Sequence, residues 1–128
     1  MVGGSERILF VDDEAILMEM GCDILEELGY RVTGVTSSTE ALELFRAQPD
    51  QFDLVMTDMT MPGMTGAELS QEILQIRADL PIILCTGLSE MINEEKAKAM
   101  GIREFAMKPL GLRNIAQITR KALERKAR

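Results

Sequence analysis

The sequence of 128 residues contains no histidine and no tryptophan, and it has only two cysteines. Without histidine the chain cannot build a Ser-His-Asp or Cys-His nucleophilic site, an HExxH zinc site or a phosphohistidine of its own. Cys22 and Cys85 stand far apart, outside any CxxC or other metal-binding spacing, and we predict that both are reduced core thiols. Any chemistry must therefore rely on carboxylates, hydroxyl groups and lysine.

Long apolar runs and an excess of positive charge are also absent. No stretch approaches the roughly 20 apolar residues that span a bilayer, and the N-terminus lacks a signal-peptide pattern, so we expect a cytoplasmic protein without membrane contact. The formal net charge of −7 argues against nucleic-acid binding, which needs a basic surface. One basic cluster near the C-terminus is explained as cations on the last turns of a helix. It consists of Arg120, Lys121, Arg125, Lys126 and Arg128.

The order of apolar segments predicts the fold class. We assign residues 6–128 to one domain that follows a small, glycine-rich and flexible N-terminal tail at residues 1–5. Short apolar runs, expected to be strands, alternate with segments of helical period, which predicts an α/β domain with a doubly wound, five-stranded parallel sheet and helices on both faces. The expected strands are Ile8–Val11, Val32–Val35, Leu54–Met56, Ile82–Cys85 and Phe105–Met107.

Capping residues mark several ends of the five expected helices. Ser37-x-x-Glu40 and Thr65-x-x-Glu68 have the capping-box pattern and are expected to open the second and third helices. Gly29 is a natural stop for the first helix. Helical periodicity covers Leu17–Leu28, Ala41–Phe45, Leu69–Ile76, a segment that begins between Ser89 and Asn93 and ends at Gly101, and a last segment from about Leu112.

Charged and hydroxyl side chains follow the strands at the edge where open α/β sheets bind ligands. The first strand leads into Asp12, Asp13 and Glu14, and the third into Thr57-Asp58. Two carboxylates about 4 Å apart repel each other by roughly 4 kcal/mol at an effective dielectric near 20, so such a cluster is expected either to take up a proton or to bind a cation. Oxygen ligands without His or Cys favour Mg²⁺. Glu14 is explained more simply as an acid that begins the first helix.

The ends of the fourth and fifth strands complete a set of groups suited to phosphoryl transfer. Thr86-Gly87 and Lys108-Pro109 reach the same edge, where Lys108 would add a positive charge to that of Mg²⁺. The sequence has neither a GxxxxGK nor a GxGxxG loop, so nucleotide binding is poorly supported. The nucleophile would then be a carboxylate, and Asp58 stands alone on the middle strand, where phosphorylation would give an acyl phosphate.

These residues occur in an order that resembles the receiver domain of two-component response regulators. The resemblance extends from about Arg7 to Ala127 and rests on four segments. They are Asp12-Asp13 after ILFV, the run from Asp58 to Gly66 (DMTMPGMTG), Thr86-Gly87, and Phe105–Pro109. The resemblance implies the flavodoxin-like fold with strand order 2-1-3-4-5. It also implies a domain that receives phosphate from a histidine kinase or phosphotransfer protein, with a small acyl phosphate as another donor.

The resemblance assigns roles to individual residues of the acidic cluster. Asp58 is similar to the phosphoacceptor of the family. Asp13 is similar to the direct Mg²⁺ ligand, with Asp58 and the backbone carbonyl of Thr60 as further ligands. Asp12 is similar to the acid that acts through metal-bound water.

Other roles concern the response to phosphate. Lys108 is similar to the lysine that pairs with the phosphoryl group, and the resemblance implies a cis peptide at Lys108-Pro109. Thr86 resembles the hydroxyl that moves toward the phosphate, and Phe105 the aromatic ring whose rotamer follows. Phe105 lacks the hydroxyl that some members carry there. Leu88 is expected to shield the acyl phosphate from water.

We therefore expect a signalling switch that catalyses its own phosphorylation and dephosphorylation and is not a metabolic enzyme. The surface that changes is expected on helix four, strand five and helix five, which is also the expected face of a homodimer. The sequence style resembles receivers fused to hybrid histidine kinases. Two alternatives stay open: a Mg²⁺-dependent phosphatase with an aspartyl nucleophile, and an interaction module that works without phosphorylation.

Overall fold

The computed structural model describes residues 3–87, 98–108 and 111–124. These residues form a five-stranded sheet in the order β2-β1-β3-β4-β5, in which all neighbouring strands are parallel. The strands are β1 (Arg7–Val11), β2 (Arg31–Val35), β3 (Leu54–Asp58), β4 (Ile82–Thr86) and β5 (Glu104–Met107). The helices are α1 (Ala15–Glu27), α2 (Ser38–Ala47), α3 (Gly66–Ile76) and α5 (Leu112–Glu124). The flavodoxin-like strand order expected from the sequence is confirmed.

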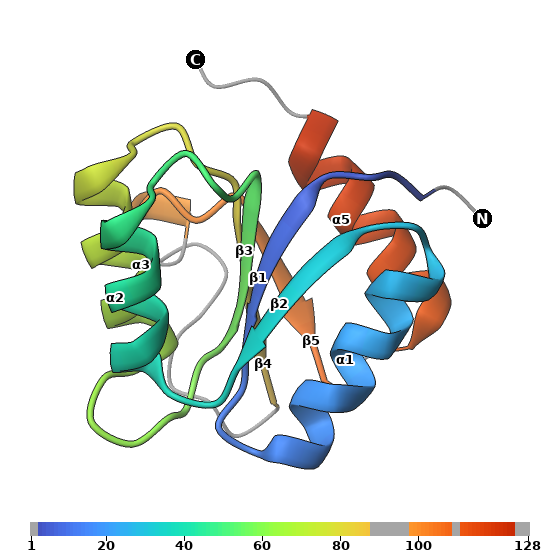
Figure 1. Cartoon of the computed structure of the whole chain (residues 1–128), viewed down its shortest axis with the longest axis horizontal. Helices are drawn as coiled ribbons and strands as arrows, with labels where there is room; N and C mark the ends of the chain where they lie inside the picture. The colour runs from blue at the N-terminus through green and yellow to red at the C-terminus, as the bar shows by residue number, and fades with distance from the viewer. Residues whose placement is uncertain (1–2, 88–97, 109–110, 125–128) are drawn as a thin grey trace.

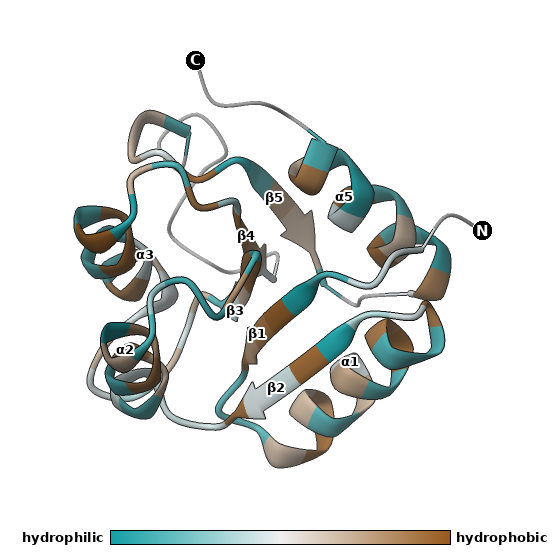
Figure 2. Cartoon of the chain, turned by 45° about the horizontal axis from the view of Figure 1, so that its top comes forward, coloured by the Kyte–Doolittle hydropathy of each residue, from teal (hydrophilic) through white to brown (hydrophobic). Residues whose placement is uncertain are grey.

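Helices cover both faces of the sheet, with α1 and α5 on one side and α2 and α3 on the other (Figure 1). Because successive side chains of a strand point to opposite faces, β1 contributes to two separate cores. Ile8 and Phe10 pack with residues of the α1–α5 side, whereas Leu9 and Val11 pack with residues of the α2–α3 side. In Figure 2 the central strands are largely brown, and the helices carry teal positions alongside their brown ones.

The middle strand β3 and its neighbour β4 are buried along their whole length, which explains why their sequences are mostly apolar. Every residue of β3 and β4 is buried, including the polar residues Thr57, Asp58 and Thr86. The sequence placed the ends of these strands before their polar residues, but the structure extends β3 to Asp58 and β4 to Thr86. Asp58 and Thr86 therefore lie in the sheet itself, where strand pairing holds their backbone atoms in place.

The helix caps follow the sequence closely. At α3, the Thr65 hydroxyl accepts a hydrogen bond from the Glu68 N–H, and the Glu68 carboxylate accepts one from the Thr65 N–H, which completes the predicted capping box. At α2, the Ser37 hydroxyl accepts from the Glu40 N–H. Gly29 has φ +101° just after α1, a left-handed conformation that glycine adopts at low cost.

Both cysteines are free thiols in the α1–α5 core, as predicted. Cys85 is buried in β4, and burial raises the pKa of its thiol to about 12. Cys22 is half-buried in α1, where burial and the charges of Glu26, Asp23 and Glu19 raise its pKa to about 11. Both side chains therefore remain protonated at neutral pH.

Several expectations concern residues outside the described ranges. The fourth helix, Leu88 and the Lys108-Pro109 peptide all fall there, wholly or in part. Among the residues that are described, no helix is long and apolar enough to cross a membrane.

Candidate phosphoacceptor site

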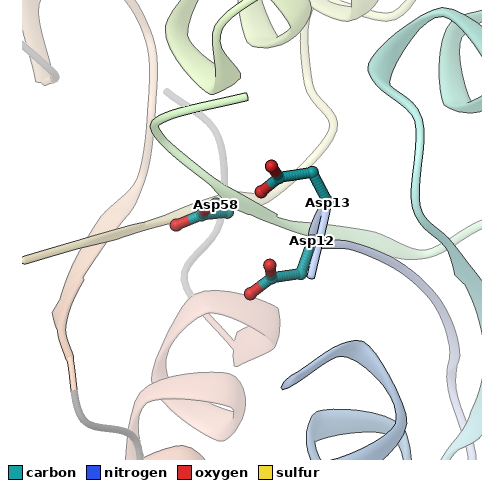
Figure 3. A group of neighbouring side chains, drawn as sticks. All are labelled: Asp12, Asp13 and Asp58. Atoms are coloured by element: carbon teal, nitrogen blue, oxygen red, sulfur yellow. The ribbon is translucent and has the colours of Figure 1, made fainter. Parts of the chain in front are cut away.

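Three aspartates meet at the carboxyl edge of the sheet. Asp12 and Asp13 directly follow β1, Asp58 is the last residue of β3, and their three side chains lie close together (Figure 3). One carboxylate oxygen from each lies within 4.8 Å of the others. Asp12 and Asp58 are only 3% and 6% exposed, while Asp13 reaches solvent. The pairing of β1 with β3, which aligns Val11 with Thr57, brings these residues together.

Lys108 places a positive charge against two of these acids. Its ammonium Nζ lies 2.7 Å from Asp58 Oδ1 and 3.3 Å from Asp12 Oδ2. The Lys108 N–H also donates to the carbonyl of Thr86 at 2.7 Å, which extends the β4–β5 ladder to the site. Burial lowers the pKa of Lys108, but the hydrogen bond and charge of Asp58, with a further contribution from Asp12, raise it above its ordinary value overall. Lys108 is therefore the resident cation of the cluster.

Hydrogen bonds to or from the backbone orient Asp12 and Asp58. The Asp12 Oδ1 atom accepts a hydrogen bond from the Glu14 N–H at 3.0 Å, which orients the Asp12 carboxylate at the start of α1. Glu14 itself is the exposed residue before α1 and lies outside the three-acid cluster, consistent with the sequence interpretation. Thr57 Oγ1 donates to the Asp58 carbonyl at 3.0 Å.

The loop between β3 and α3 packs directly against the backbone of Asp58. Gly66 begins α3, and its N–H donates to the Met59 carbonyl at 2.7 Å. A Cβ atom on Gly66 would lie 2.0 Å from the Asp58 carbonyl oxygen, so only glycine allows this approach. Thr60 lies exposed in the same loop, two residues after Asp58.

Thr86 ends β4, the strand beside Asp58, and Phe105 lies on the neighbouring strand β5. Thr86 is 1% exposed, and its Oγ1 has no hydrogen-bond partner among the residues that the structure describes. An unpaired buried hydroxyl costs stability, so such a group is notable beside a charged site. Phe105 is half-buried and packs against the α2–α3 core, where it pairs in register with Leu84. The predicted switch residues therefore occupy neighbouring strands, although their switching role stays a prediction.

An apolar groove between α1 and α5 ends at this site. It has a volume of about 360 Å³ and is lined by Phe10, Asp12, Leu17, Met20, Gly21, Ile24, Lys108 and Ile115. Two further features increase the apolar surface of α1: Ile16 is 72% exposed and Met20 is 54% exposed. Asp12 and Lys108 thus belong both to the acidic cluster and to the end of the groove.

The sequence located the charged groups of the site, and it included Gly66 in the motif that follows Asp58, but it missed Gly21. The structure brings together Asp12, Asp13, Asp58 and Lys108, as the convergence of parallel strands predicted. The sequence patterns did not mark Gly21, in the middle of α1, as a functional candidate. A Cβ on Gly21 would lie 2.3 Å from the Phe10 ring, so Gly21 lets α1 approach β1 beside the groove. An isolated glycine inside a helical pattern was the signal available for it.

Comparison with known proteins agrees with this geometry. Residues 8–120 match the family model described as the response regulator receiver domain. The chemotaxis protein CheY of Thermotoga maritima is 34% identical over 105 residues, which cover 81% of this chain and 86% of that protein. A putative two-component response regulator of Arabidopsis thaliana is 31% identical over 120 residues. That match covers 94% of this chain but only 19% of the plant protein, so the chain spans about a fifth of such relatives.

Solved structures resemble the fold over nearly its whole length. A response regulator receiver domain protein from Clostridium thermocellum superposes with a TM-score of 0.87 at 30% identity, covering 92% of this chain and 94% of that one. The chemotaxis protein CheY4 of Vibrio cholerae gives a TM-score of 0.82 at 27% identity, covering 94% and 100%. With the family model and these relatives, the chain belongs to the receiver domains of two-component response regulators.

Proposed function

We propose that this domain accepts a phosphoryl group on Asp58 and works as a phosphorylation-controlled switch. The observation that carries the proposal is the 2.7 Å contact between Lys108 Nζ and the buried Asp58 carboxylate, inside a cluster of three aspartates. Asp58 is the acid of the cluster that comes from a central strand of the sheet. Its neighbours supply the charges that a phosphoryl group would meet.

The transfer is a substitution at phosphorus. An Asp58 oxygen forms the new P–O bond, and the P–N bond of a phosphohistidine, or the P–O bond of a small acyl phosphate, breaks. The leaving imidazole or carboxylate keeps the bonding electron pair, and the imidazole takes up a proton from solvent. Lys108 is placed to stabilise the negative charge on the phosphoryl oxygens as it is transferred.

A hard divalent cation fits the donor set of the site. Asp12, Asp13 and Asp58 offer carboxylate oxygens that converge, with no histidine or thiol among them, which is the chemistry that Mg²⁺ prefers. We propose that Asp13 and Asp58 hold the ion directly, with the Thr60 carbonyl, and that Asp12 contributes through a water molecule. When bound, Mg²⁺ would supply positive charge to the phosphoryl oxygens.

The buried hydroxyl of Thr86 supports a switch. Its Oγ1 lacks a partner among the described residues, and a phosphoryl group on Asp58 would introduce acceptor oxygens nearby. Movement of Thr86 toward that group would vacate space beside β5, where Phe105 is only half-buried. We propose that the Phe105 ring then changes rotamer and alters the surface that includes β5 and α5, and with it the capacity to form a homodimer.

The groove suggests where a protein donor contacts the domain. The apolar surface of Leu17, Met20 and Ile24 leads to Lys108 and Asp12, so a helix lying on α1 could present a phosphohistidine to Asp58. Helix α1 also carries four exposed acids, which favour a donor with a basic surface. They are Glu19, Asp23, Glu26 and Glu27. We therefore propose a histidine kinase or phosphotransfer protein as the partner, and the cytoplasm as the place where they meet.

Intact-mass measurement tests the proposal directly. With Mg²⁺ and acetyl phosphate, the protein should gain the mass of one phosphoryl group, and chelation of Mg²⁺ should prevent the gain. Asp58→Asn should abolish it, whereas Asp79→Asn, at an exposed aspartate far from the cluster, should leave it unchanged. Retention of labelling in Asp58→Asn would refute the assignment. Steady hydrolysis of a phosphate ester without a stable mass gain would indicate a phosphatase instead of a switch.

A further inference from the structure

Residues 3–6, which precede β1, lie across the end of the domain that is farthest along the strands from the aspartates. The Gly4 N–H donates to the Leu28 carbonyl at 3.2 Å, and the Glu6 carbonyl accepts from the Arg31 N–H at 3.0 Å. The segment therefore joins the α1–β2 turn as well as β1. Figure 1 shows it beside the C-terminal end of α5.

Arg120 of α5 connects this segment to the helix. Its Nη2 lies 2.7 Å from Glu6 Oε2, and its Nη1 donates to Glu6 Oε1 at 3.1 Å, which makes a bidentate pair. Nη1 also donates to the Gly3 carbonyl and to the Tyr30 hydroxyl, both at 3.3 Å. The Arg120 side chain is only 19% exposed, so these contacts are largely shielded from water. The Arg120 side chain thus joins α5 both to residues 3–6 and to Tyr30.

Glycines make this close packing possible. A Cβ on Gly4 would lie 2.3 Å from Glu6 Oε1, 2.5 Å from Arg120 Nη1 and 2.9 Å from the Tyr30 ring. A Cβ on Gly3 would lie 2.0 Å from the Leu28 carbonyl oxygen, which is backbone and cannot move aside cheaply. A side chain at either position would displace the segment from its seat.

We propose that residues 3–6 form a strap, and that its seating on Arg120 positions the C-terminal half of α5. The same half is tied to β5, because Arg103 donates to the Ala122 carbonyl at 3.1 Å and Lys121 lies 3.4 Å from Glu104. The first half of α5 lines the groove through Ile115. The strap therefore holds one end of α5, and the other end of this helix borders the groove. Displacement of the strap should therefore change the position of α5.

Amide hydrogen exchange of the full chain tests the strap. In Gly4→Ala and Glu6→Gln, amides of the last turns of α5 should exchange about tenfold faster than in the wild type. The added Cβ of the first variant would push the segment away from Arg120, and the second variant removes the charge that pairs with Arg120. Amides of β3 and β4 should be nearly unchanged. As a matched control, Glu72→Gln removes an exposed contact to Arg46 on the α2–α3 side and should leave α5 unaffected.

A charge exchange separates positioning from general destabilisation. Glu6→Arg and Arg120→Glu should each increase exchange in α5, and the double variant, which restores an opposite-charge pair, should recover most of the protection. Unchanged exchange of α5 in the single variants would refute the proposal. So would an equal increase at every amide, because that result would show that the segment contributes only to global stability.

Discussion

Replacing Gly66 with alanine tests whether the packing behind Asp58 is as close as the structure indicates. Gly66 is the first residue of α3, where helix propensity alone favours alanine by up to about 1 kcal/mol. A reading of the local sequence would therefore predict a slightly more stable protein. The tertiary structure predicts the opposite, because the added Cβ would lie 2.0 Å from the Asp58 carbonyl oxygen and 2.9 Å from Leu84 Cδ1.

The expected magnitude follows from these contacts. Overpacking a well-filled site costs about 1–3 kcal/mol, and the upper end applies here because the nearest atom belongs to the backbone. Weakening the 2.7 Å hydrogen bond from the Gly66 N–H to the Met59 carbonyl adds about 1 kcal/mol. After the propensity gain is subtracted, the free energy of unfolding should fall by about 2–3 kcal/mol.

Urea unfolding measures this change, and a melting temperature about 10 °C lower should accompany it. Gly63→Ala is the matched control, because Gly63 has φ +80° with no atom within 4 Å of a built Cβ. It should lose only the conformational cost of about 1 kcal/mol. Acetyl phosphate labelling should slow in Gly66→Ala and not in Gly63→Ala. A Gly66→Ala protein as stable as the wild type would show that α3 does not pack against the Asp58 carbonyl as closely as the structure indicates.

Three further predictions concern the site, the groove and the core. Lys108→Met should slow labelling of Asp58 by acetyl phosphate about 100-fold, since it removes the cation 2.7 Å from the acceptor; a rate within threefold of wild type would contradict this. Met20→Lys should slow transfer from a phosphorylated phosphotransfer protein about tenfold but leave acetyl phosphate labelling unchanged, with Ile76→Lys on α3 as the control; equal effects would exclude the groove. Burial raises the pKa of Cys85 from 9.0 to about 12, so its stabilising effect is complete below pH 9 and is lost as the pH rises toward 12. Thiol titration with a disulfide reagent at pH 8 should find Cys85 protected until urea unfolds the protein, and rapid native labelling would contradict its burial.

Much of the fold could be predicted because its signals are local or periodic. Burial on both faces makes most residues of β3 and β4 apolar, and the capping box at Thr65 and Glu68 depends on residues only three positions apart. The convergence of Asp12 and Asp58 was also accessible, because parallel strands present their carboxyl ends at one edge. The catalytic and switching roles of these residues remain predictions that the experiments above address.

Contacts between distant segments were not accessible in the same way. The Arg120–Glu6 pair joins residues 114 positions apart, and nothing in either local sequence distinguishes it from an ordinary exposed charge. Residues 1–5 were accordingly expected to be a flexible tail, and two of them, Gly3 and Gly4, have defined hydrogen-bond partners in the structure. The geometry that gives Gly66 its role depends on the position of the Asp58 carbonyl, which exists only after α3 packs against β3.

Local patterns in the sequence were enough to predict the succession of strands and helices along the chain, the absence of histidine chemistry, and the set of acids and lysine at one edge of the sheet. These features follow from alternation, periodicity and composition, which act over a few residues at a time. Three further features became visible in the tertiary structure. Lys108 lies within 3.3 Å of both Asp12 and Asp58, and a groove between α1 and α5 ends at that lysine. The N-terminal segment also packs against α5 through the Glu6–Arg120 pair. Those outcomes depend on distances between segments far apart in the chain, and packing of the whole core sets such distances.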